Sequence, residues 1–169
     1  AIVVDKLLHT TADNIWAMGY VTGGLQFTYI SLDDYRIVRD ELLGEGKRST
    51  DDRKNVPYSV FMTPPLSRVG MTEEQARESG ADIQVVTLPV AAIPRARVMN
   101  DTRGVLKAIV DNKTQRMLGA SLLCVDSHEM INIVKMVMDA GLPYSILRDQ
   151  IFTHPSMSES LNDLFSLVK

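Results

Sequence analysis

The sequence has few of the residues that define several functional classes. It contains one cysteine, Cys124, so no internal disulfide can form. That cysteine lies in the apolar stretch "GASLLCVD", which favours a buried structural thiol over a reactive one. Lysine and arginine are scattered and number 18 against 21 acidic residues, for a net charge of −3. Because phosphate binding needs a concentrated basic face, we expect no nucleic-acid partner.

Long apolar runs are also missing. No run approaches the roughly 20 apolar residues that a membrane helix needs, and no segment has the basic, apolar and small-residue order of a signal peptide. We therefore expect a cytoplasmic protein that does not bind membranes. Since 45% of the 169 residues are apolar, the chain is long enough to bury a sizeable core in one or two small domains.

The N-terminal third predicts two strands followed by a helix. "AIVVD" (1–5) is typical of a buried strand with no polar lead-in, as if the chain had been cut inside a larger fold, and "IWAMG" (15–19) predicts a second strand. Apolar residues at near-helical spacing predict a helix over residues 25–43, with Gly44 as its C-terminal cap. "GEGKRSTDDRKN" (44–55) has no large apolar side chain and predicts a solvated linker at a domain boundary.

The rest of the chain predicts an α+β fold, an antiparallel sheet with flanking helices. "YSVFM", "DIQVVTLPV", "VLKAIVD" and "RMLGASLL" alternate as strands do, and "DNKT" supplies a turn between the last two. "TEEQ", from Thr72, is a capping box that predicts a short helix ending near Gly80. A helix is also predicted from Asp126 to Gly141, and its many apolar residues predict two buried faces, one of which could meet a partner subunit.

The stretch "IFTHPSMSESL" (151–161) has two interpretations. In the structural one, Ser156 and Glu159 form a capping box for a terminal helix, and His154 is incidental. In the functional one, the Glu159 carboxylate reaches back to Nδ1 of His154 and makes the imidazole a general acid/base. The residues alone leave both interpretations open.

Two other histidines carry weaker signals. His128 and Glu129 begin the pattern of a zinc-protease helix, but Asn132 stands where the second histidine is required, so we expect no metal site. His9 lies in a polar stretch and is expected to be a solvated side chain.

Several segments resemble one known family. "FTHPSMSE" resembles the H-P-T-x-x-E signature of the flavin-dependent pyridine nucleotide-disulfide oxidoreductases, with Ser156 in place of threonine. "VPYSVFMTPPLSRVGMTEEQA", "VVTLPVAAIPRARV", "GVLKAIVDNKTQRMLGASLL" and "SHEMINIV" resemble successive segments of the family's dimerisation domain, in order. "TTADNIWAMGYVTGGLQFTYISLDD" resembles the second flavin-binding motif. Its "LQFTY" is closer to the mercuric-reductase branch than to glutathione reductase, although the paired C-terminal cysteines of mercuric reductase are missing.

The resemblance implies a division of the chain and a role for it. Residues 1–50 match the end of the nucleotide and FAD-binding domain, and residues 56–169 match the dimerisation domain. The family's C-x-x-x-x-C disulfide and G-x-G-x-x-G fingerprints do not occur in the chain. The resemblance thus implies the C-terminal portion of an oxidoreductase that uses FAD and NAD(P)H, inactive by itself and without a cofactor of its own. The electron acceptor and the choice between NADH and NADPH stay open.

The resemblance also implies site residues and a partner. His154 would be the acid/base and Glu159 the carboxylate that orients it, delivered across a homodimer interface to the flavin and disulfide of the other subunit. The positions that meet the flavin are matched by Gly19, Tyr20, Gln26, Phe27 and Thr28. Tyr20 stands where most members have an aspartate, and a phenol is longer and uncharged, so it cannot replace that charge-assisted contact. The alternative from another class is a free-standing, non-enzymatic dimerisation or binding module whose terminal motif is only a helix cap.

Overall fold

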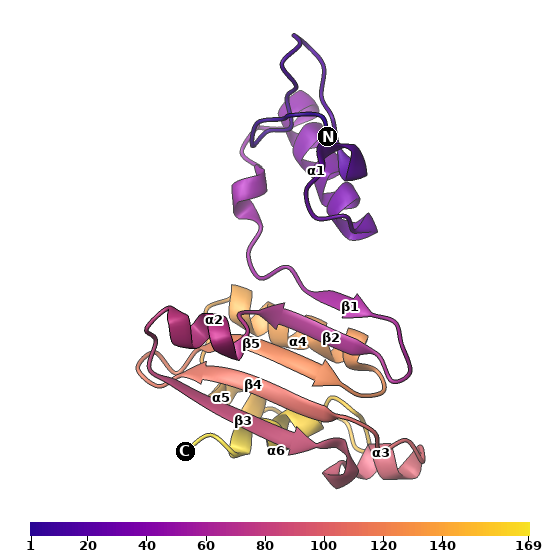
Figure 1. Cartoon of the computed structure of the whole chain (residues 1–169), viewed down its shortest axis with the longest axis vertical. Coiled ribbons are helices and arrows are strands. Elements are labelled where there is room, and N and C mark those ends of the chain that lie inside the picture. Colours follow the sequence, from indigo (N-terminus) through magenta and orange to yellow (C-terminus); the bar gives the residue numbers. More distant parts are fainter. The chain divides into compact units, whose positions relative to one another are not determined.

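The computed structural model describes all residues, 1–169, and divides them into two compact units, Ala1–Lys54 and Asn55–Lys169. Figure 1 shows the first unit in indigo and purple and the second from magenta to yellow. Each unit is described by itself.

The first unit contains one long helix, α1 (Thr28–Leu43), with the short 3₁₀ helices η1 (Gly19–Thr22) and η2 (Thr50–Asp52). The predicted helix is confirmed, and Gly44 is its C-cap. Ile37 and Val38 of α1 pack against Leu8 in a small core that Val4 and Trp16 cover. This core holds the N-terminal loop on α1.

The two strands predicted in the first unit are wrong. Residues 1–5 and 15–19 form no strand, and only an isolated antiparallel bridge joins His9 and Trp16. Outside that bridge, Ile2 donates its N–H to the Val21 carbonyl at 2.8 Å. A strand needs a neighbour along its length to pair with, and this unit contains no sheet that could provide one.

The predicted solvated linker is also wrong in part. Ser49 and Asp52 form a capping box around η2, which sequence reasoning did not detect. Asp40 of α1 accepts hydrogen bonds from the backbone N–H groups of Lys47 and Arg48, at 2.7 and 2.9 Å. The segment is therefore fixed to α1 by polar contacts although it buries no large apolar side chain.

The second unit is built on a five-stranded antiparallel sheet in the order β1-β2-β5-β4-β3, which confirms the predicted α+β class. The strands are β1 (Tyr58–Val60), β2 (Leu66–Gly70), β3 (Ile83–Pro89), β4 (Val105–Asp111) and β5 (Met117–Leu123). β4 and β5 form the predicted hairpin, in which Asp111 Oδ1 accepts the N–H groups of Lys113 and Thr114 at 2.8 and 2.7 Å.

The strand β2 was missed because its sequence is polar. Ser67 points into the interior, where its hydroxyl contacts those of Ser59 and Ser127 at 2.7 and 2.9 Å. On the opposite side of the strand, Arg68 donates to Ser121 Oγ at 3.1 Å. These contacts satisfy the polar groups of a strand whose sequence lacks the usual apolar alternation.

Helices flank the sheet. They are α2 (Glu73–Glu78), η3 (Val90–Ala92), α3 (Pro94–Val98), α4 (Ser127–Asp139), α5 (Ser145–Arg148) and α6 (Ser160–Ser166). Figure 1 shows α4, α5 and α6 on one face of the sheet, and α4 and α6 contact its strands. Thr72 and Gln75 make the predicted capping box of α2. None of the helices in the chain has the length and apolar character needed to cross a membrane.

The helix α4 forms within the predicted range of Asp126 to Gly141. Asp126 adopts a left-handed conformation with φ of 60° and makes no side-chain cap hydrogen bond. The apolar residues of α4 serve a single core: Met130, Ile131, Val134 and Val137 are buried, while Ile133 and Met138 pack against them. Only Met136, 70% exposed, is left without cover. The helix thus lacks the second apolar face that was expected.

The cysteine behaves as predicted. Cys124 is fully buried in the core of the second unit, with its Sγ 3.8 Å from the thioether of Met130. Burial raises the pKa of the thiol to about 12, with a smaller contribution from the charge of Asp126. The thiol therefore stays protonated and unreactive near neutral pH.

Candidate acid/base site and flavin-facing segment

The loop between α5 and α6 is anchored at both ends. Phe152 packs partly against the core, and Met157 is 3% exposed. The side-chain amide of Asn162 in α6 donates to the carbonyls of Leu147, Arg148 and Gln150, at 2.8, 3.0 and 3.0 Å. Sequence reasoning missed Asn162, because nothing in the local pattern shows that an amide in α6 meets carbonyls 12 to 15 residues earlier. These anchors fix the segment that carries His154.

His154 and Glu159 are brought together. Nδ1 of His154 lies 2.8 Å from Oε2 of Glu159, across a loop that contains the cis peptide between His154 and Pro155. The other oxygen, Oε1, accepts the Ser156 N–H at 3.3 Å, and Ser156 Oγ accepts the Glu159 N–H at 3.2 Å. The reciprocal capping contacts and the contact with histidine therefore coexist, because Glu159 uses a different oxygen for each.

This geometry defines what His154 can do chemically. A carboxylate accepts the Nδ1 proton, so the neutral ring keeps Nε2 as a free base pointing away from Glu159. The side chain of His154 is 70% exposed, whereas that of Glu159 is 16% exposed. The imidazole can therefore exchange a proton with a group brought to it from outside.

The second unit supplies no reacting group for His154. Its only thiol, Cys124, is buried, and no three or more histidine, cysteine or acidic side chains gather in the chain as they would around a metal ion. Beside the site, Ile151 is 94% exposed. An interface with another protein would cover this side chain.

The five flavin-matched residues lie in one continuous segment that leads into α1. Gly19 starts η1 with φ of +79°, and a Cβ there would lie 3.0 Å from Ser31 Oγ, so the turn requires glycine. Tyr20 is 55% exposed. The N–H of Gly19 donates to Oδ2 of Asp34 at 2.7 Å, a contact that sequence reasoning missed.

The rest of this segment forms the start of α1. Phe27 is the N-cap residue, and its ring stacks on that of Tyr29 at 5.1 Å between centroids. Gln26 and Thr28 are exposed. A glycine turn lets another group approach the backbone closely, although Tyr20 offers a neutral phenol instead of a carboxylate.

The expectation of a solvated His9 is wrong. Its Nδ1 lies 3.0 Å from Asp5 Oδ2 and its Nε2 lies 3.4 Å from Glu41 Oε1, while its ring tilts against that of Trp16. The hydrogen bond with His9 is the main cause that lowers the pKa of Asp5. His9 therefore ties the N-terminal loop to α1, a contact that is invisible locally because Glu41 lies 32 residues away.

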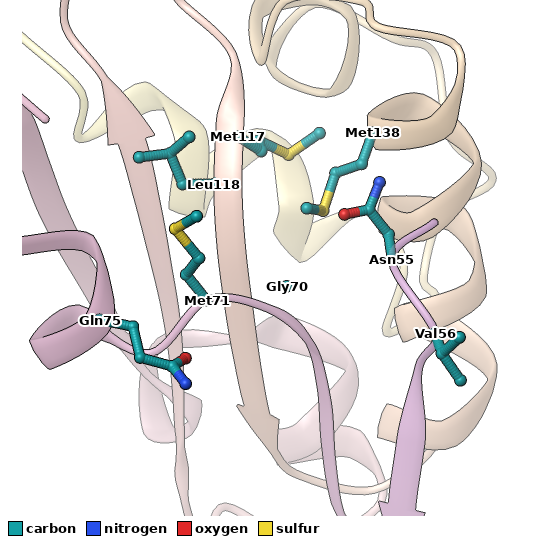
Figure 2. Close-up of a pocket in the computed structure, with 8 residues that line it drawn as sticks. All are labelled: Asn55, Val56, Gly70, Met71, Gln75, Met117, Leu118 and Met138. Carbon is teal, nitrogen blue, oxygen red and sulfur yellow. The ribbon is translucent and has the colours of Figure 1, made fainter. Parts of the chain in front are cut away.

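A cleft of about 570 Å³ opens elsewhere in the second unit. Figure 2 shows its lining, which contains no charged side chain: Asn55, Val56, Gly70, Met71, Gln75, Met117, Leu118 and Met138. Three thioethers and two amides provide no acid, base or nucleophile for catalysis. The acid/base pair is therefore the stronger candidate for a functional site.

A family comparison agrees with this fold. Residues 56–165 match the family model described as "Pyridine nucleotide-disulphide oxidoreductase, dimerisation domain". The chain belongs to this family, which confirms the resemblance found in the sequence.

Two relatives show which branch of the family the chain resembles. The chain is 99% identical over 169 residues to the probable pyridine nucleotide-disulfide oxidoreductase RclA of Escherichia coli K12, covering all of this chain and 38% of that protein. It is 35% identical over 160 residues to a mercuric reductase of Staphylococcus aureus, covering 95% of this chain and 29% of the reductase. The chain thus spans less than two fifths of the length of these relatives, and its likeness to mercuric reductases is confirmed.

Solved structures give the same result. The structure of the "HOCl-induced flavoprotein disulfide reductase RclA" from E. coli matches with a TM-score of 0.98 and 99% identity, over 99% of this chain and 38% of that one. LpdA from Mycobacterium tuberculosis matches with a TM-score of 0.88 over 99% of this chain and 36% of that one. At 22% identity, the second match supports the fold alone.

Proposed function

We propose that the second unit supplies the acid/base pair His154 and Glu159 to the active site of a flavin-dependent disulfide oxidoreductase. The observation that carries the proposal is the 2.8 Å contact between Nδ1 of His154 and Oε2 of Glu159. It places a carboxylate-oriented imidazole on an anchored, exposed loop within a family dimerisation domain. There, Nε2 takes up or releases the proton that accompanies reduction of the acceptor or of a cysteine pair.

The first unit has a separate role in the proposal. Residues 1–50 complete an FAD-binding domain, with residues 19–28 facing the cofactor, and residues 56–169 form the dimerisation domain. Bound FAD would supply the electron transfer from NAD(P)H to the redox-active cysteines. The residues of this chain then only bind and orient the cofactor and exchange protons. In this proposal the 169 residues do not oxidise NAD(P)H by themselves, because they contain neither a C-x-x-x-x-C pair nor a glycine fingerprint. The protein acts in the cytoplasm.

The site is shared between two subunits in this proposal. His154 has no reacting group within its own unit, and Ile151 beside it is bare. A two-fold homodimer places the same surface of each subunit against the other, so each subunit can present its histidine to its partner. The partner surface then covers the exposed loop and excludes water from the proton transfer.

Variants of a full-length protein test this function. By that term we mean the 99% identical E. coli relative with its C-terminal part replaced by the present sequence. His154→Gln should lower the turnover of NAD(P)H oxidation by about 10² to 10⁴, because a general acid/base is lost. Stability should change little, since the ring is exposed. His128→Gln, at a half-exposed histidine in α4, is the matched control and should keep full turnover.

Glu159→Gln separates the proposed function from its non-enzymatic alternative. Glutamine can still accept the Ser156 N–H and so preserves the cap, but it removes the charge that orients the imidazole. We expect unchanged thermal stability and turnover reduced by at least about tenfold, which corresponds to ~1.4 kcal/mol of barrier. Full activity in both Glu159→Gln and His154→Gln would instead show that the motif is only a helix cap and takes no part in catalysis.

A further inference from the structure

A single buried carboxylate holds the turn at Gly19. Asp34 of α1 is 2% exposed and accepts the Gly19 N–H at 2.7 Å through Oδ2. Its other oxygen, Oδ1, accepts a hydrogen bond from the guanidinium of Arg53. A buried carboxylate is costly unless it is paired and hydrogen-bonded, and these two contacts provide both conditions.

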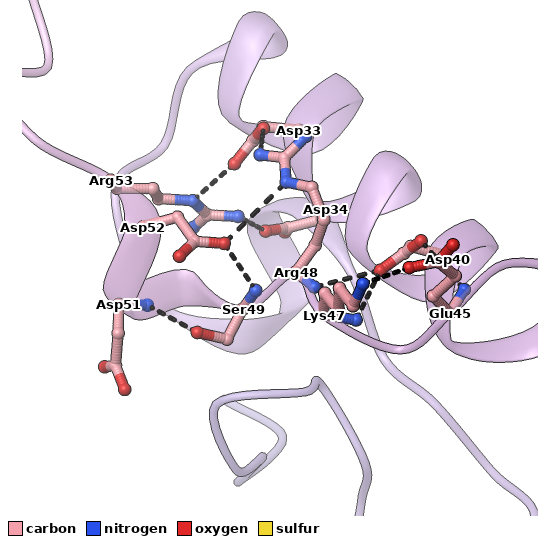
Figure 3. Close-up of polar contacts among 10 residues, drawn as sticks. All are labelled: Asp33, Asp34, Asp40, Glu45, Lys47, Arg48, Ser49, Asp51, Asp52 and Arg53. Atoms are coloured by element: carbon pink, nitrogen blue, oxygen red, sulfur yellow. Dashed lines mark hydrogen bonds and ion pairs between the residues drawn. The ribbon is translucent and has the colours of Figure 1, made fainter.

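A second layer of charges fixes Arg53, as Figure 3 shows. Nε of Arg53 donates to Asp33 Oδ2 at 2.7 Å, and Arg48 donates to Asp33 Oδ1 at 2.9 Å. Burial opposes ionisation of Asp33, but the hydrogen bonds from Arg53 and Arg48 outweigh it and hold the pKa of this carboxyl below its ordinary value. The side chain of Arg53 is only 18% exposed, so its forked contacts are well shielded from water.

We propose that Asp34 is a positioning residue for the flavin: it sets the orientation of the Gly19–Tyr20 turn, and Arg53 holds its carboxylate in place. This inference rests on the proposed function, in which residues 19–28 face FAD. Gly19 has a positive φ, and a Cβ there would lie 3.0 Å from Ser31 Oγ, so the turn already favours glycine. With its N–H directed inward to Asp34, the peptide plane that leads into Gly19 is fixed, and so is the direction in which Tyr20 leaves the turn.

Asp33 provides a matched control for Asp34. The two carboxylates are neighbours on α1 and share Arg53, but only Asp34 contacts the turn. Asparagine at position 34 keeps the shape but has only one acceptor oxygen, so it must give up either the Gly19 N–H or Arg53. Asparagine at position 33 loses contacts to arginine and leaves the turn untouched.

The first experiment measures FAD affinity. The full-length protein and its variants are stripped of flavin, and the dissociation constant of added FAD is followed by flavin fluorescence. We expect Asp34→Asn to weaken FAD binding at least tenfold and Asp33→Asn by less than threefold. Equal affinity in wild type and Asp34→Asn would overturn the inference while leaving the proposed function intact. A wild-type protein that binds no FAD would instead refute the proposed function, and the inference with it.

The second experiment observes the turn directly. Hydrogen exchange of the Gly19 amide should be at least tenfold faster in Asp34→Asn than in wild type, and unchanged in Asp33→Asn. If Asp34→Asn does not fold, Arg53→Gln replaces it, because this change leaves the carboxylate on the turn without its main cation. We then expect faster Gly19 exchange and weaker FAD binding. Wild-type values for both in Arg53→Gln would contradict the inference.

Discussion

Different interactions stabilise the interior of each of the two units. The second unit buries 23 apolar residues in one core, whereas the first unit has a core of only three, Leu8, Ile37 and Val38. The first unit relies instead on polar contacts, among them those of Asp34, Arg53 and His9. Since apolar burial is the dominant stabilising term in folding, we expect the second unit to be an independent fold and the first to be marginal.

For its size, the first unit also exposes more large apolar side chains than the second. Twelve large apolar side chains are exposed in the 54 residues of the first unit, and twelve in the 115 residues of the second. Such a density of bare apolar surface is expected if the first unit packs against the rest of an FAD-binding domain, as proposed above. The second unit needs cover only locally, as at Ile151 and Phe61.

The largest effect is expected in the core of the second unit. Phe165 is fully buried, so Phe165→Ala should lower the free energy of unfolding of this unit by about 3 to 5 kcal/mol. Urea denaturation followed by far-UV circular dichroism measures the change. Phe61→Ala, at a side chain 79% exposed, is the control and should shift it by less than about 0.5 kcal/mol. Similar effects of the two changes would contradict the described core.

A somewhat smaller effect is expected from the first unit. Ile37→Ala should lower the free energy of unfolding of the first unit by about 2 to 5 kcal/mol, which is enough to unfold a marginal unit. The unfolding transition of the second unit should not change. Trp16 is the single tryptophan of the chain and packs on this core, so its fluorescence reports the first unit alone. One shared transition in fluorescence and circular dichroism would show that the units do not unfold separately.

Position 20 tests whether the first unit lacks a flavin ligand. In the full-length protein, Tyr20→Asp introduces the carboxylate that the family resemblance places here and should strengthen FAD binding by about 10- to 100-fold, since a hydrogen bond to a charged group contributes ~1.5 to 3 kcal/mol. Tyr20→Phe should bind FAD no better than the unchanged chain. Equal affinities of the aspartate and phenylalanine variants would mean that position 20 does not contact the cofactor.

The smallest effect is expected in the pH dependence of the stability of the first unit. The pKa of Asp33 is lower in the folded state than in the unfolded chain, because the arginine contacts outweigh burial. Its stabilising contribution is therefore complete above the unfolded pKa, near 4, and is lost as pH falls through the lower folded value. Urea titrations followed by Trp16 fluorescence should show this loss in acid, and Asp33→Asn should reduce it. The transition of the second unit provides the reference.

The same contrast explains what could be predicted from the sequence. In the second unit, alternation and capping boxes are local signals, so four strands, the helix after Thr72 and the pair His154 and Glu159 were found. The polar strand β2 was missed because its partners are serines of other elements. In the first unit, Asp34 and His9 act through residues 15 to 32 positions away, and such contacts leave no local pattern.

The most direct test of the central claim is subunit complementation in the full-length protein. One variant carries His154→Ala and the other carries serine in place of the redox-active cysteines; each alone should be nearly inactive. After the two are mixed and allowed to exchange subunits, heterodimers should recover NAD(P)H-dependent turnover, because one of their two sites combines intact cysteines with the His154 of the partner subunit. No recovery, with exchange verified by mass spectrometry, would show that His154 does not serve the other subunit and would contradict the account.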